Sequence, residues 1–417
     1  MSYLNMTKKL TIKCRVCYST NLTRVMSLGS QYLSDFTIVL QKPESYPLEL
    51  LLCKECKLVQ LEHTAPQKSL YNERYGYKSG INETMKRELK EIVTRAMTKV
   101  ALSKNSLVID IGSNDGTLLS NYPRNAIRVA VEPVKKLAIE SKVYADFVIN
   151  DFFSLETMKK YLPEKILRPK AKIITAISMF YDLEDPNKFV ADVAKLLAPD
   201  GVFVIQQNYL LGMLKQNAFD NIVHEHIEYY SLLSLEKLLA RHNLEVFDVE
   251  TTDLNGGSFR NYIGHVGGKH QSNQHNVNQM RSLEKRAMLH RKKTYDEFSK
   301  RVQKNKIEIV KFVKEKVRMG KKIYFYGAST RGNTLIQYYG LDRKYISAAV
   351  ERNPEKWGKK IASMGIPIIS EAQARKDRPD YLLVLPWYFK EEFLKREANY
   401  LQQGGHFIFP LPKLEVV

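Results

Sequence analysis

The middle of the chain alternates short apolar runs with longer stretches in which apolar residues recur at helical spacing. Between residues 106 and 208 the apolar runs are SLVIDIG, IRVAVEP, ADFVIND, KIITAIS and GVFVIQQN. A helical pattern over residues 82–102 precedes them. Strands separated by helices of this length predict an α/β fold with a parallel, doubly wound sheet.

A second region of the same kind lies toward the C-terminal end. Its strand patterns are KKIYFYGAST, YISAAVERN, DYLLVLPW and GGHFIFP. Between the two regions, the polar segment 267–279 is expected to be a linker or exposed loop. A helical region then extends to about residue 318, with apolar side chains near helical spacing at Tyr295, Phe298, Val302, Ile309, Val313 and Val317. We therefore expect a second, smaller Rossmann-like unit after this helix.

The composition is that of a globular protein with a strong basic excess. The 417 residues are too many for one ordinary core, so two or three domains are expected. The net charge is +20, and basic residues are densest between 290 and 321. They fall on the outer face of the predicted helix without interleaved aromatic residues, so no nucleic-acid partner is expected. The sequence has no signal peptide and no run of about 18 apolar residues, so a cytoplasmic protein without membrane contact is expected.

The four cysteines form two C-x-x-C pairs. They are Cys14, Cys17, Cys53 and Cys56. Two such pairs can complete a tetrahedron of thiolates around Zn²⁺, which leaves no open coordination position for catalysis. Free cysteines are the alternative. We expect a structural zinc that organises a small domain with little core of its own.

A glycine-containing turn follows the first predicted strand. The turn carries Asp110, Gly112, Asn114, Asp115 and Gly116. Glycines let a ligand approach the backbone closely, and ligands of open α/β sheets bind beyond the carboxyl ends of the strands. The next strand ends in Glu132, which can accept hydrogen bonds from ribose hydroxyls. The third ends in Asp151 and Phe152, which can contact an adenine amino group and cover the ring, and Ser178 ends the fourth.

The glycine spacing is also close to that of a dinucleotide-binding turn. However, the loop is acidic at Asn114-Asp115, which would repel a pyrophosphate and suits the sulfonium and amino groups of S-adenosylmethionine. We therefore expect S-adenosylmethionine, rather than a dinucleotide or a turn without a ligand.

The segment NAFDNIVHEHIEYYS carries His224, Glu225 and His226. On a helix, residues two apart point to different faces, so a shared metal ion is not expected; on an extended stretch the two histidines would share a face. Histidine titrates near neutrality, and an adjacent carboxylate can tune it, so an acid–base centre is the favoured hypothesis. Histidines held in structural hydrogen bonds are the alternative.

Together these motifs resemble the sugar C-methyltransferase family that makes branched-chain deoxysugars. The markers are CRVC…CKEC, YNERYGYKSGIN, DIGSNDGTLL, FDNIVHEHIEYYSL, NGGSFRNYI and YGASTRGNTLIQYYG, which span essentially the whole chain. The resemblance implies four segments: a zinc-binding domain at 1–70, an S-adenosylmethionine-dependent methyltransferase domain at 71–265, a linker with helices at 266–318 and a Rossmann-like substrate-binding domain at 319–417.

The resemblance also implies a reaction, methyl transfer to C3 of a nucleotide-linked 4-keto-6-deoxy sugar through an enolate. The product would serve a surface polysaccharide or a glycosylated metabolite. His226 would be the base, Glu225 would orient it or the sugar, and His224 belongs to the same catalytic group. Tyr75 and Tyr77 would face the same cleft.

The resemblance further implies a nucleotide-sugar site. Its candidate residues are Asn255, Gly256, Arg260, Ser329, Arg331 and Asn333. The first two would shape the sugar pocket, and Arg260 would lie near phosphate. The loop 327–333 follows a predicted strand and opens a helix, so its amides and Arg331 could hold a diphosphate. A purely structural half-domain is the alternative.

The chain departs from the family pattern at two places. Val223 stands where many relatives carry a tyrosine, and the segment with Tyr181 and Asp182 stands where many carry an asparagine and a histidine. The acid–base group can therefore differ from that of its relatives. Two rival functions stay open: an O- or N-methyltransferase on a related nucleotide sugar, and a non-catalytic RNA- or partner-binding protein on the same fold.

Overall fold

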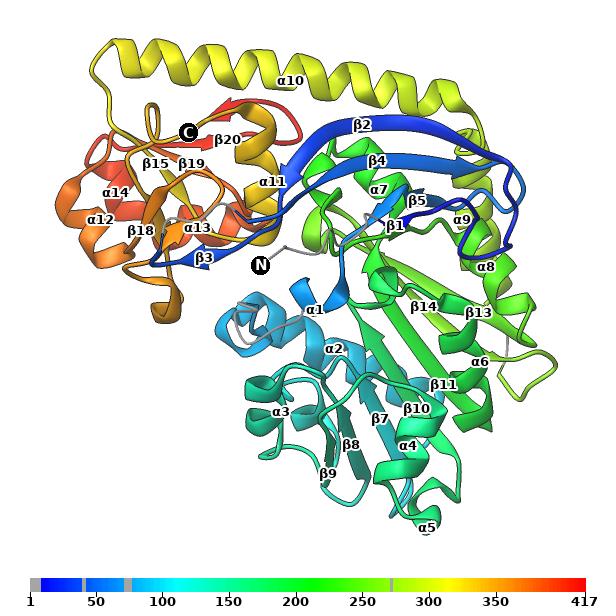
Figure 1. Cartoon of the computed structure of the whole chain (residues 1–417). Helices are drawn as coiled ribbons and strands as arrows, with labels where there is room; N and C mark the ends of the chain where they lie inside the picture. Colours follow the sequence, from blue (N-terminus) through cyan, green and yellow to red (C-terminus); the bar gives the residue numbers. More distant parts are fainter. Residues whose placement is uncertain (1–8, 40–42, 71–76, 271–272) are drawn as a thin grey trace, which may run out of the picture.

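The chain forms three units, each built on its own sheet (Figure 1). The computed structural model describes residues 9–39, 43–70, 77–270 and 273–417. Two short strands cross between units. Strand β3 (Phe36–Thr37), from the N-terminal segment, pairs in the C-terminal sheet, and β12 (Glu228–Tyr229), from the central segment, pairs in the N-terminal sheet. The three units therefore interlock rather than follow one another as separate bodies.

The N-terminal unit is an antiparallel sheet with the strand order β12-β5-β4-β2. Its own elements are β2 (Leu22–Tyr32), β4 (Ser45–Cys53) and β5 (Val59–Leu61), with the small pair β1 (Lys9–Leu10) and β6 (His63–Thr64) and the short helix α1 (Gln67–Leu70). Tyr46, Leu48 and Leu50 of β4 are buried, while the residues between them are partly exposed. This alternation is expected of an antiparallel sheet with one covered face.

The central unit is a seven-stranded sheet with the order β13-β14-β11-β10-β7-β8-β9. The strands are β7 (Leu107–Ile111), β8 (Ile127–Val131), β9 (Phe147–Ile149), β10 (Ala171–Ile177), β11 (Leu197–Asn208), β13 (Leu244–Thr252) and β14 (Ser258–His265). The first five are parallel, and β14 is antiparallel to both of its neighbours. The predicted strands are all present, and the doubly wound α/β fold is confirmed.

Helices cover both faces of this sheet. They are α2 (Glu83–Lys99), α3 (Lys135–Ser141), α4 (Leu155–Tyr161), α5 (Glu164–Leu167), α6 (Pro186–Leu196), α7 (Leu210–Lys215) and α8 (Leu232–Ala240). Because successive strand residues point to opposite faces, Val108 packs in the cluster with α2, and Ile109 in the cluster with α4, α6 and α8. The chain passes from β9 to β10 across β7, so the strand order reverses between β7 and β10, where such folds bind ligands.

The C-terminal unit is an eight-stranded sheet with the order β21-β20-β19-β15-β16-β18-β17-β3. Its strands are β15 (Ile323–Tyr326), β16 (Ala349–Glu351), β17 (Lys360–Ile361), β18 (Ile366–Ser370), β19 (Tyr381–Val384), β20 (His406–Phe409) and β21 (Glu415–Val416). Its helices are α11 (Thr330–Tyr339), α12 (Glu371–Asp377), α13 (Lys390–Arg396) and α14 (Ala398–Gln402). Strands β16, β15, β19 and β20 are parallel, as the second βα pattern predicted, and β18, which the sequence analysis did not identify, adds to the parallel set.

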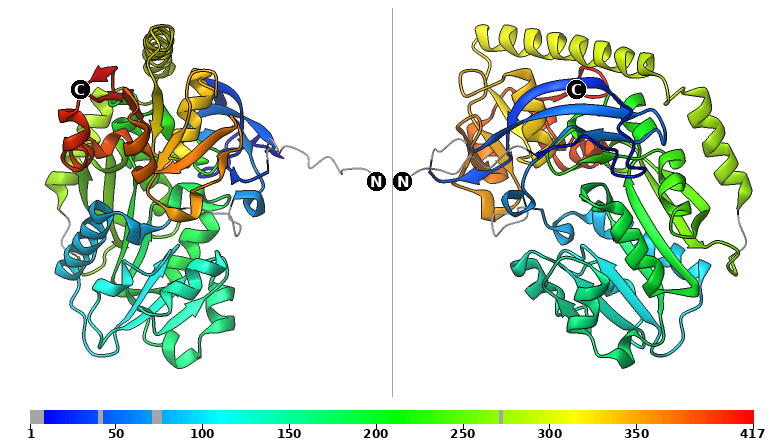
Figure 2. Two further views of the ribbon diagram at one scale, coloured as in Figure 1. Left: turned by 90° about the vertical axis from the view of Figure 1, so that its left-hand side faces the viewer. Right: turned by 45° about the vertical axis from the view of Figure 1, so that its right-hand side comes forward.

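Helices α9 (Gln274–Arg286) and α10 (Lys292–Arg318) connect the central and C-terminal units. In every view, α10 lies along one edge of the molecule (Figures 1 and 2). Its buried residues include Tyr295, Phe298, Val302, Ile309 and Val313, so the predicted apolar face is confirmed. The predicted polar loop is shorter than expected, because the Asn273 side chain caps α9 and starts the helix within it. In the described residues, no helix is long and apolar enough to cross a membrane.

Candidate functional site

The four cysteines come together at the N-terminal sheet. All four Sγ atoms lie within 4.8 Å of one another, with 3.3 Å between Cys14 and Cys56 and 3.5 Å between Cys17 and Cys53. A tetrahedral site with Zn–S bonds of about 2.3 Å has sulfur atoms about 3.8 Å apart, so the cluster fits zinc. The hydrogen bond from the Cys56 thiol lowers the pKa of Cys14 to about 5, which favours a thiolate there at neutral pH.

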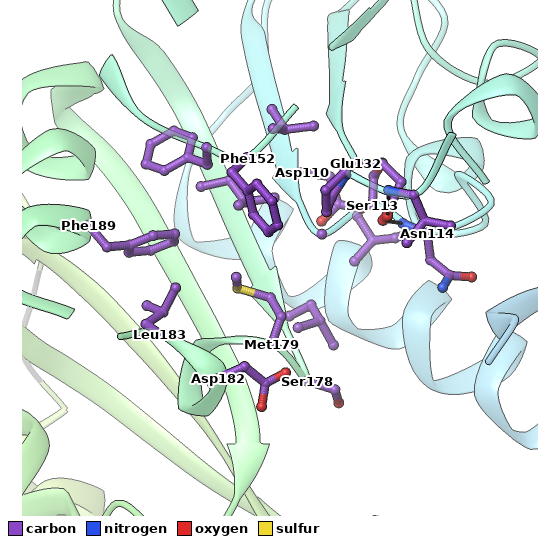
Figure 3. Close-up of a pocket in the computed structure, with 18 of the residues that line it drawn as sticks. Asp110, Ser113, Asn114, Glu132, Phe152, Ser178, Met179, Asp182, Leu183 and Phe189 are labelled. Atoms are coloured by element: carbon purple, nitrogen blue, oxygen red, sulfur yellow. Dashed lines mark hydrogen bonds between the residues drawn. The ribbon is translucent and has the colours of Figure 1, made fainter. Parts of the chain in front are cut away.

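A cavity of about 290 Å³ opens beyond the carboxyl ends of β7, β8 and β10 (Figure 3). Six of the predicted cofactor residues line it: Asp110, Gly112, Asn114, Glu132, Phe152 and Ser178. Figure 3 draws Asp110 and Glu132 on one side, Leu183 and Phe189 on the other, and Phe152 between them. Gly112 has a φ of 70°, and a Cβ there would lie 3.0 Å from Met179 Cγ, so only glycine suits this turn.

Two carboxyl groups are built into the sheet end of the cavity. Glu132 accepts hydrogen bonds from the backbone amides of Asn114 (2.9 Å) and Val134 (2.8 Å), which fixes its carboxylate at the end of β8. Asp110 accepts one from the Thr175 hydroxyl at 2.6 Å. Burial raises the pKa of Asp110 to about 7, and the charge of Glu132 adds to the shift. Burial also raises the pKa of Glu132, against the two amide donors.

The cavity suits a cationic ligand better than a pyrophosphate. Six lining residues are acidic, including Asp182, and only Lys188 is basic. A dinucleotide would bring two phosphate charges that this lining cannot pair. S-adenosylmethionine fits this lining. Carboxylates can attract its sulfonium and its ammonium and can accept hydrogen bonds from its ribose hydroxyls, and Phe152 can cover its adenine.

Three predicted cofactor residues do not line the cavity. Asp115 accepts a hydrogen bond from the Gly80 amide (2.8 Å), as Asn114 does from the Ser79 amide (2.9 Å), so these side chains hold the lead-in segment against the glycine turn. Asp151 accepts from the amide of its neighbour Phe152. At Gly116 a Cβ would lie 3.0 Å from Ser141, so this glycine allows close packing. Asp115 thus bonds the lead-in segment, Asp151 bonds within its own loop, and Gly116 serves packing.

The lining also contains residues that the sequence did not single out. They are mostly apolar: Met85, Leu89, Leu118, Val134, Phe153, Met179, Leu183 and Phe189. Met85 and Leu89 belong to the apolar face of α2, which the periodicity had predicted only as a helix face. Apolar lining residues carry no chemical signal in a sequence, so only the fold could reveal them.

The two histidines of the HEH segment point to different partners. His224 is buried, and its Nε2 lies 3.1 Å from the Tyr46 carbonyl oxygen of β4. Burial lowers its pKa to about 4, so it is neutral at pH 7. His226 instead faces Tyr181, with ring centroids 4.2 Å apart. A metal shared by the two is therefore not supported, and His224, predicted in the catalytic group, is engaged in holding the segment to β4.

His226 is held as a neutral base. Its Nδ1 lies 2.9 Å from the Asn221 carbonyl oxygen, which can only accept, so Nδ1 carries the proton and Nε2 keeps its lone pair. Burial, together with the nearby positive charge of Arg331, lowers the pKa of His226 to about 3. The neighbouring Glu225 is half-buried, and burial raises its pKa to about 7. The segment therefore carries an unprotonated imidazole and, at the preceding residue, a carboxyl group that titrates near neutrality.

Arg331 joins the C-terminal unit to the central unit. Its Nη2 donates to the buried carboxylate of Asp220 at 2.6 Å, its Nη1 donates to the Asn255 carbonyl at 2.8 Å, and Tyr388 lies 4.5 Å beneath its guanidinium. Asp220 also accepts from Trp387 Nε1. The guanidinium is thus already paired, while its charge still reaches His226.

The remaining substrate candidates differ in placement. Gly256 packs against Trp387, which a Cβ would approach to 2.9 Å. Ser329 caps α11 through the Gly332 amide, and Asn333 accepts from Ser363 in the same unit. The Ser329 hydroxyl and Asn333 Oδ1 are therefore occupied within the C-terminal unit, whereas the buried Asn333 Nδ2 has no hydrogen-bond partner in the described part of the chain. Tyr77 lines the cavity and is 47% exposed. Tyr75 lies outside the described residues.

Arg260 is not available for the phosphate contact that the sequence suggested. It is 2% exposed on β14 and is ion-paired with Glu88, Glu91 and Glu250. Its Nε donates to Gln206 Oε1 at 2.6 Å. A buried guanidinium needs carboxylate partners, and α2 and β13 supply them. We therefore leave Arg260 out of the substrate site.

A seven-stranded sheet of this order, with an acidic cavity at its switch point, is the fold of an S-adenosylmethionine-dependent methyltransferase. Three family models match the chain: a zinc binding domain at 14–71, a methyltransferase domain at 81–249 and a C-methyltransferase C-terminal domain at 253–412. The C-methyltransferase NovU of Streptomyces niveus is 30% identical over 410 residues, covering 97% of this chain and 96% of NovU. The chain belongs to this C-methyltransferase family.

Solved structures resemble parts of the chain. An S-adenosylmethionine-dependent methyltransferase from Clostridium acetobutylicum is 13% identical, with 43% of this chain and 92% of that chain covered and a TM-score of 0.34. An O-methyltransferase from a trans-AT PKS multienzyme of Brevibacillus brevis is 12% identical, with 49% and 80% covered and a TM-score of 0.36.

Proposed function

We propose that this C-methyltransferase acts on a nucleotide-linked 4-keto-6-deoxy sugar and methylates the carbon next to the ketone, C3. The observation that carries the proposal is the neutral His226, whose free Nε2 belongs to a segment packed against the loop that lines the donor cavity. Transfer to either atom uses a base, but transfer to carbon needs that base at a C–H bond, so exchange of the C3 proton distinguishes the two reactions.

A ketone makes the adjacent C3–H acidic, because the electron pair left by the proton is delocalised onto the carbonyl oxygen. His226 Nε2 would accept this proton. Ionised Glu225 would stabilise the imidazolium that forms. Bound S-adenosylmethionine supplies an electrophilic methyl group to the carbon. Rigid pocket walls would hold the sugar carbon in line with that methyl group, and this positioning accounts for much of the rate.

The fold of the C-terminal unit supports the proposal that the substrate carries a nucleotide. It has a parallel sheet with a glycine turn after β15, the usual framework for nucleotides. Its Arg331 lies at the joint with the central unit and carries the positive charge near His226. Because this guanidinium is paired with Asp220, we assign it to setting the local potential rather than to a free phosphate contact.

The proposal is tested by exchange at C3. Nucleotide-linked 4-keto sugars would be incubated with the enzyme in deuterated water without a methyl donor, and C3 deuteration would be followed by mass spectrometry. We expect enzyme-dependent exchange that His226→Ala abolishes while donor binding, measured by calorimetry, stays nearly intact. His290→Ala, an exposed histidine between α9 and α10, is the matched control.

Two results would contradict the proposal. One is methylation of the sugar on oxygen or nitrogen with the C3 proton retained, which would indicate the rival transferase. The other is full exchange and turnover in His226→Ala, which would remove this residue from the chemistry.

A further inference from the structure

Tyr181 lies in the loop whose neighbouring residues line the donor cavity, and its ring contacts His226. It lies in the short turn Phe180–Asp182 directly after β10 and is 6% exposed. Ser178 and Asp182, on either side of it in sequence, both line the donor cavity (Figure 3). Its ring contacts the His226 ring at 4.2 Å with an interplanar angle of 56°. A hydrogen bond joins its side chain to Ser178, so the phenol links a residue that lines the cavity to the ring of the base.

The backbone fixes this arrangement. The Tyr181 carbonyl accepts a hydrogen bond from the Ile227 amide at 3.0 Å, which ties the turn after β10 to the HEH segment. Within the HEH segment, the contact of His226 Nδ1 with the Asn221 carbonyl fixes the orientation of the imidazole. The relative placement of Tyr181 and His226 is thus set by one main-chain hydrogen bond and by the contact of the imidazole with a main-chain carbonyl, in addition to side-chain packing.

The charges around Tyr181 keep its hydroxyl protonated. Burial raises the pKa of Tyr181 well above its usual value, and the carboxylate of Asp182 adds to the shift. Tyr77 also raises it, whereas Arg331 and a hydrogen bond with Ser178 act in the opposite direction. At neutral pH the side chain is a hydrogen-bond donor and not a phenolate.

Enolate formation needs a donor at the oxygen that gains charge. Among the described groups near His226, Arg331 has its Nε and Nη2 on Asp220 and its Nη1 on the Asn255 carbonyl. The Asn221 carbonyl can only accept. The Tyr181 hydroxyl is a neutral donor whose ring contacts the base, in a buried environment where a hydrogen bond to a developing oxyanion is strong.

We propose that Tyr181 is a catalytic residue that donates a hydrogen bond to the ketone oxygen of the sugar. This role rests on the proposed function. In the step, the C3–H bond breaks and its proton moves to His226 Nε2. The C–H electron pair forms the C3=C4 bond, and the carbonyl π pair moves onto the oxygen. The phenol keeps its proton and stabilises that oxygen. In the methyl transfer, the C3=C4 pair would form the bond from C3 to the methyl group, the oxygen pair would return to the carbonyl, and the methyl–sulfur bond of the donor would break and leave its pair on sulfur.

The role has a consequence for substrate choice. A donor fixed at this point selects sugars with a carbonyl beside the carbon that is methylated. A nucleotide sugar with a hydroxyl there would lack both the acidic C–H and the oxyanion that Tyr181 stabilises. We infer that the ketone is required for reaction even where the nucleotide part binds normally.

The test is Tyr181→Phe, which removes one oxygen atom and keeps the ring against His226. We expect the donor-free C3 exchange rate and the methylation kcat both to fall by about 10²-fold or more, the usual effect of removing one oxyanion donor. The KM for the sugar and the affinity for S-adenosylmethionine should change little. Tyr338→Phe, a half-buried tyrosine on the face of α11 toward Phe219, is the matched control.

Each outcome separates this inference from the proposed function. If the wild-type protein neither exchanges nor methylates any 4-keto nucleotide sugar, the proposed function fails and the role of Tyr181 fails with it. If the wild type is active and a folded Tyr181→Phe protein keeps exchange and kcat within about twofold, only the role of Tyr181 is overturned. A rise in KM with kcat unchanged also overturns it, because Tyr181 would then be only a wall of the pocket.

Discussion

Burial decides the charge of each ionisable side chain around His226. It makes His226 a neutral base and Tyr181 a neutral donor, and it brings Glu225 to the point where its carboxyl titrates near neutrality. None of these states follows from residue type. The sequence could indicate the HEH segment as an acid–base centre, but it could not separate His224 from His226, because their difference lies in their partners on β4 and in the turn after β10.

The pH dependence of the reaction is predicted from Glu225. Burial raises its pKa to about 7, so the ionised fraction falls as the pH falls below that value. In the proposed reaction this carboxylate stabilises the imidazolium form of His226, so kcat should decline on the acid side with a midpoint near neutrality. Asp110 of the donor cavity has a similar pKa, so the profiles are taken at saturating S-adenosylmethionine. His226, with a pKa lowered to about 3, adds no limb in this range. Profiles between about pH 5 and pH 9 would show the limb in wild type and not in Glu225→Gln; an unchanged limb in the variant contradicts this assignment.

Glu132 is predicted to hold the methyl donor. In Glu132→Gln the negative charge is lost. The side-chain amide nitrogen of the glutamine must also face one of the two backbone N–H groups that donate to the carboxylate in the wild type. We expect the affinity for S-adenosylmethionine to fall by about tenfold or more, which is about 1.4 kcal/mol. Calorimetry would measure it, with Glu164→Gln on the exposed helix α5 as the control. Equal affinities in the two variants would show that the donor binds elsewhere.

At the scale of elements, the zinc unit extends directly into the base-bearing segment. Strand β12 begins two residues after His226 and pairs with β5, while Leu61 of β5 donates its amide to the Ile227 carbonyl. Strand β5 follows Cys56 by three residues, so the thiolate cluster anchors this ladder. The donor cavity, in contrast, is built on the seven-stranded sheet.

Zinc removal is therefore predicted to affect catalysis more than donor binding. In Cys53→Ser, or after chelation, the N-terminal sheet loses its anchor, and methylation should fall by more than about 10²-fold because the base is misplaced. Affinity for S-adenosylmethionine should be largely retained. Zinc content, calorimetry and turnover would be measured on the same preparation. Full turnover without zinc, or parallel loss of both properties, would contradict this division.

Elements with a sustained pattern were predictable, and elements without one were not. The runs that became β7, β8, β9, β10 and β11 are apolar and bounded by turn residues, so periodicity and length identified them. Strands β3 and β12 are two residues long, too short to carry a pattern, yet they join the units. Their pairing depends on tertiary placement that no local signal encodes.

At the scale of the whole molecule, the buried ion pair between Arg331 and Asp220 joins the C-terminal unit to the central unit. Asp220 is fully buried, the Arg331 side chain is 11% exposed, and Trp387 completes the contact. Tertiary packing also explains why Arg260 could be mistaken for a phosphate ligand: its partner Glu88 comes from α2, far away in sequence, and Glu250 reaches it only through the pairing of β13 with β14.

Breaking this pair on one side only should be costly. Asp220→Asn leaves a buried guanidinium without its carboxylate, and we expect the free energy of unfolding to fall by about 3–5 kcal/mol. Asp220→Asn combined with Arg331→Met removes both charges and should recover part of the loss. Urea denaturation of the three proteins would measure the difference. A single variant as stable as the wild type would mean that the pair contributes nothing to the joint.

The central claim is that a methyl group passes from the acidic cavity to a carbon that His226 has deprotonated. Its most direct test is ¹³C NMR of the product made from S-adenosylmethionine with a ¹³C-labelled methyl group and a nucleotide-linked 4-keto sugar. The account predicts a labelled methyl bonded to a sugar carbon next to the ketone, with that carbon's proton lost. A labelled methoxy or N-methyl signal, or no labelled sugar from any 4-keto substrate, would contradict it.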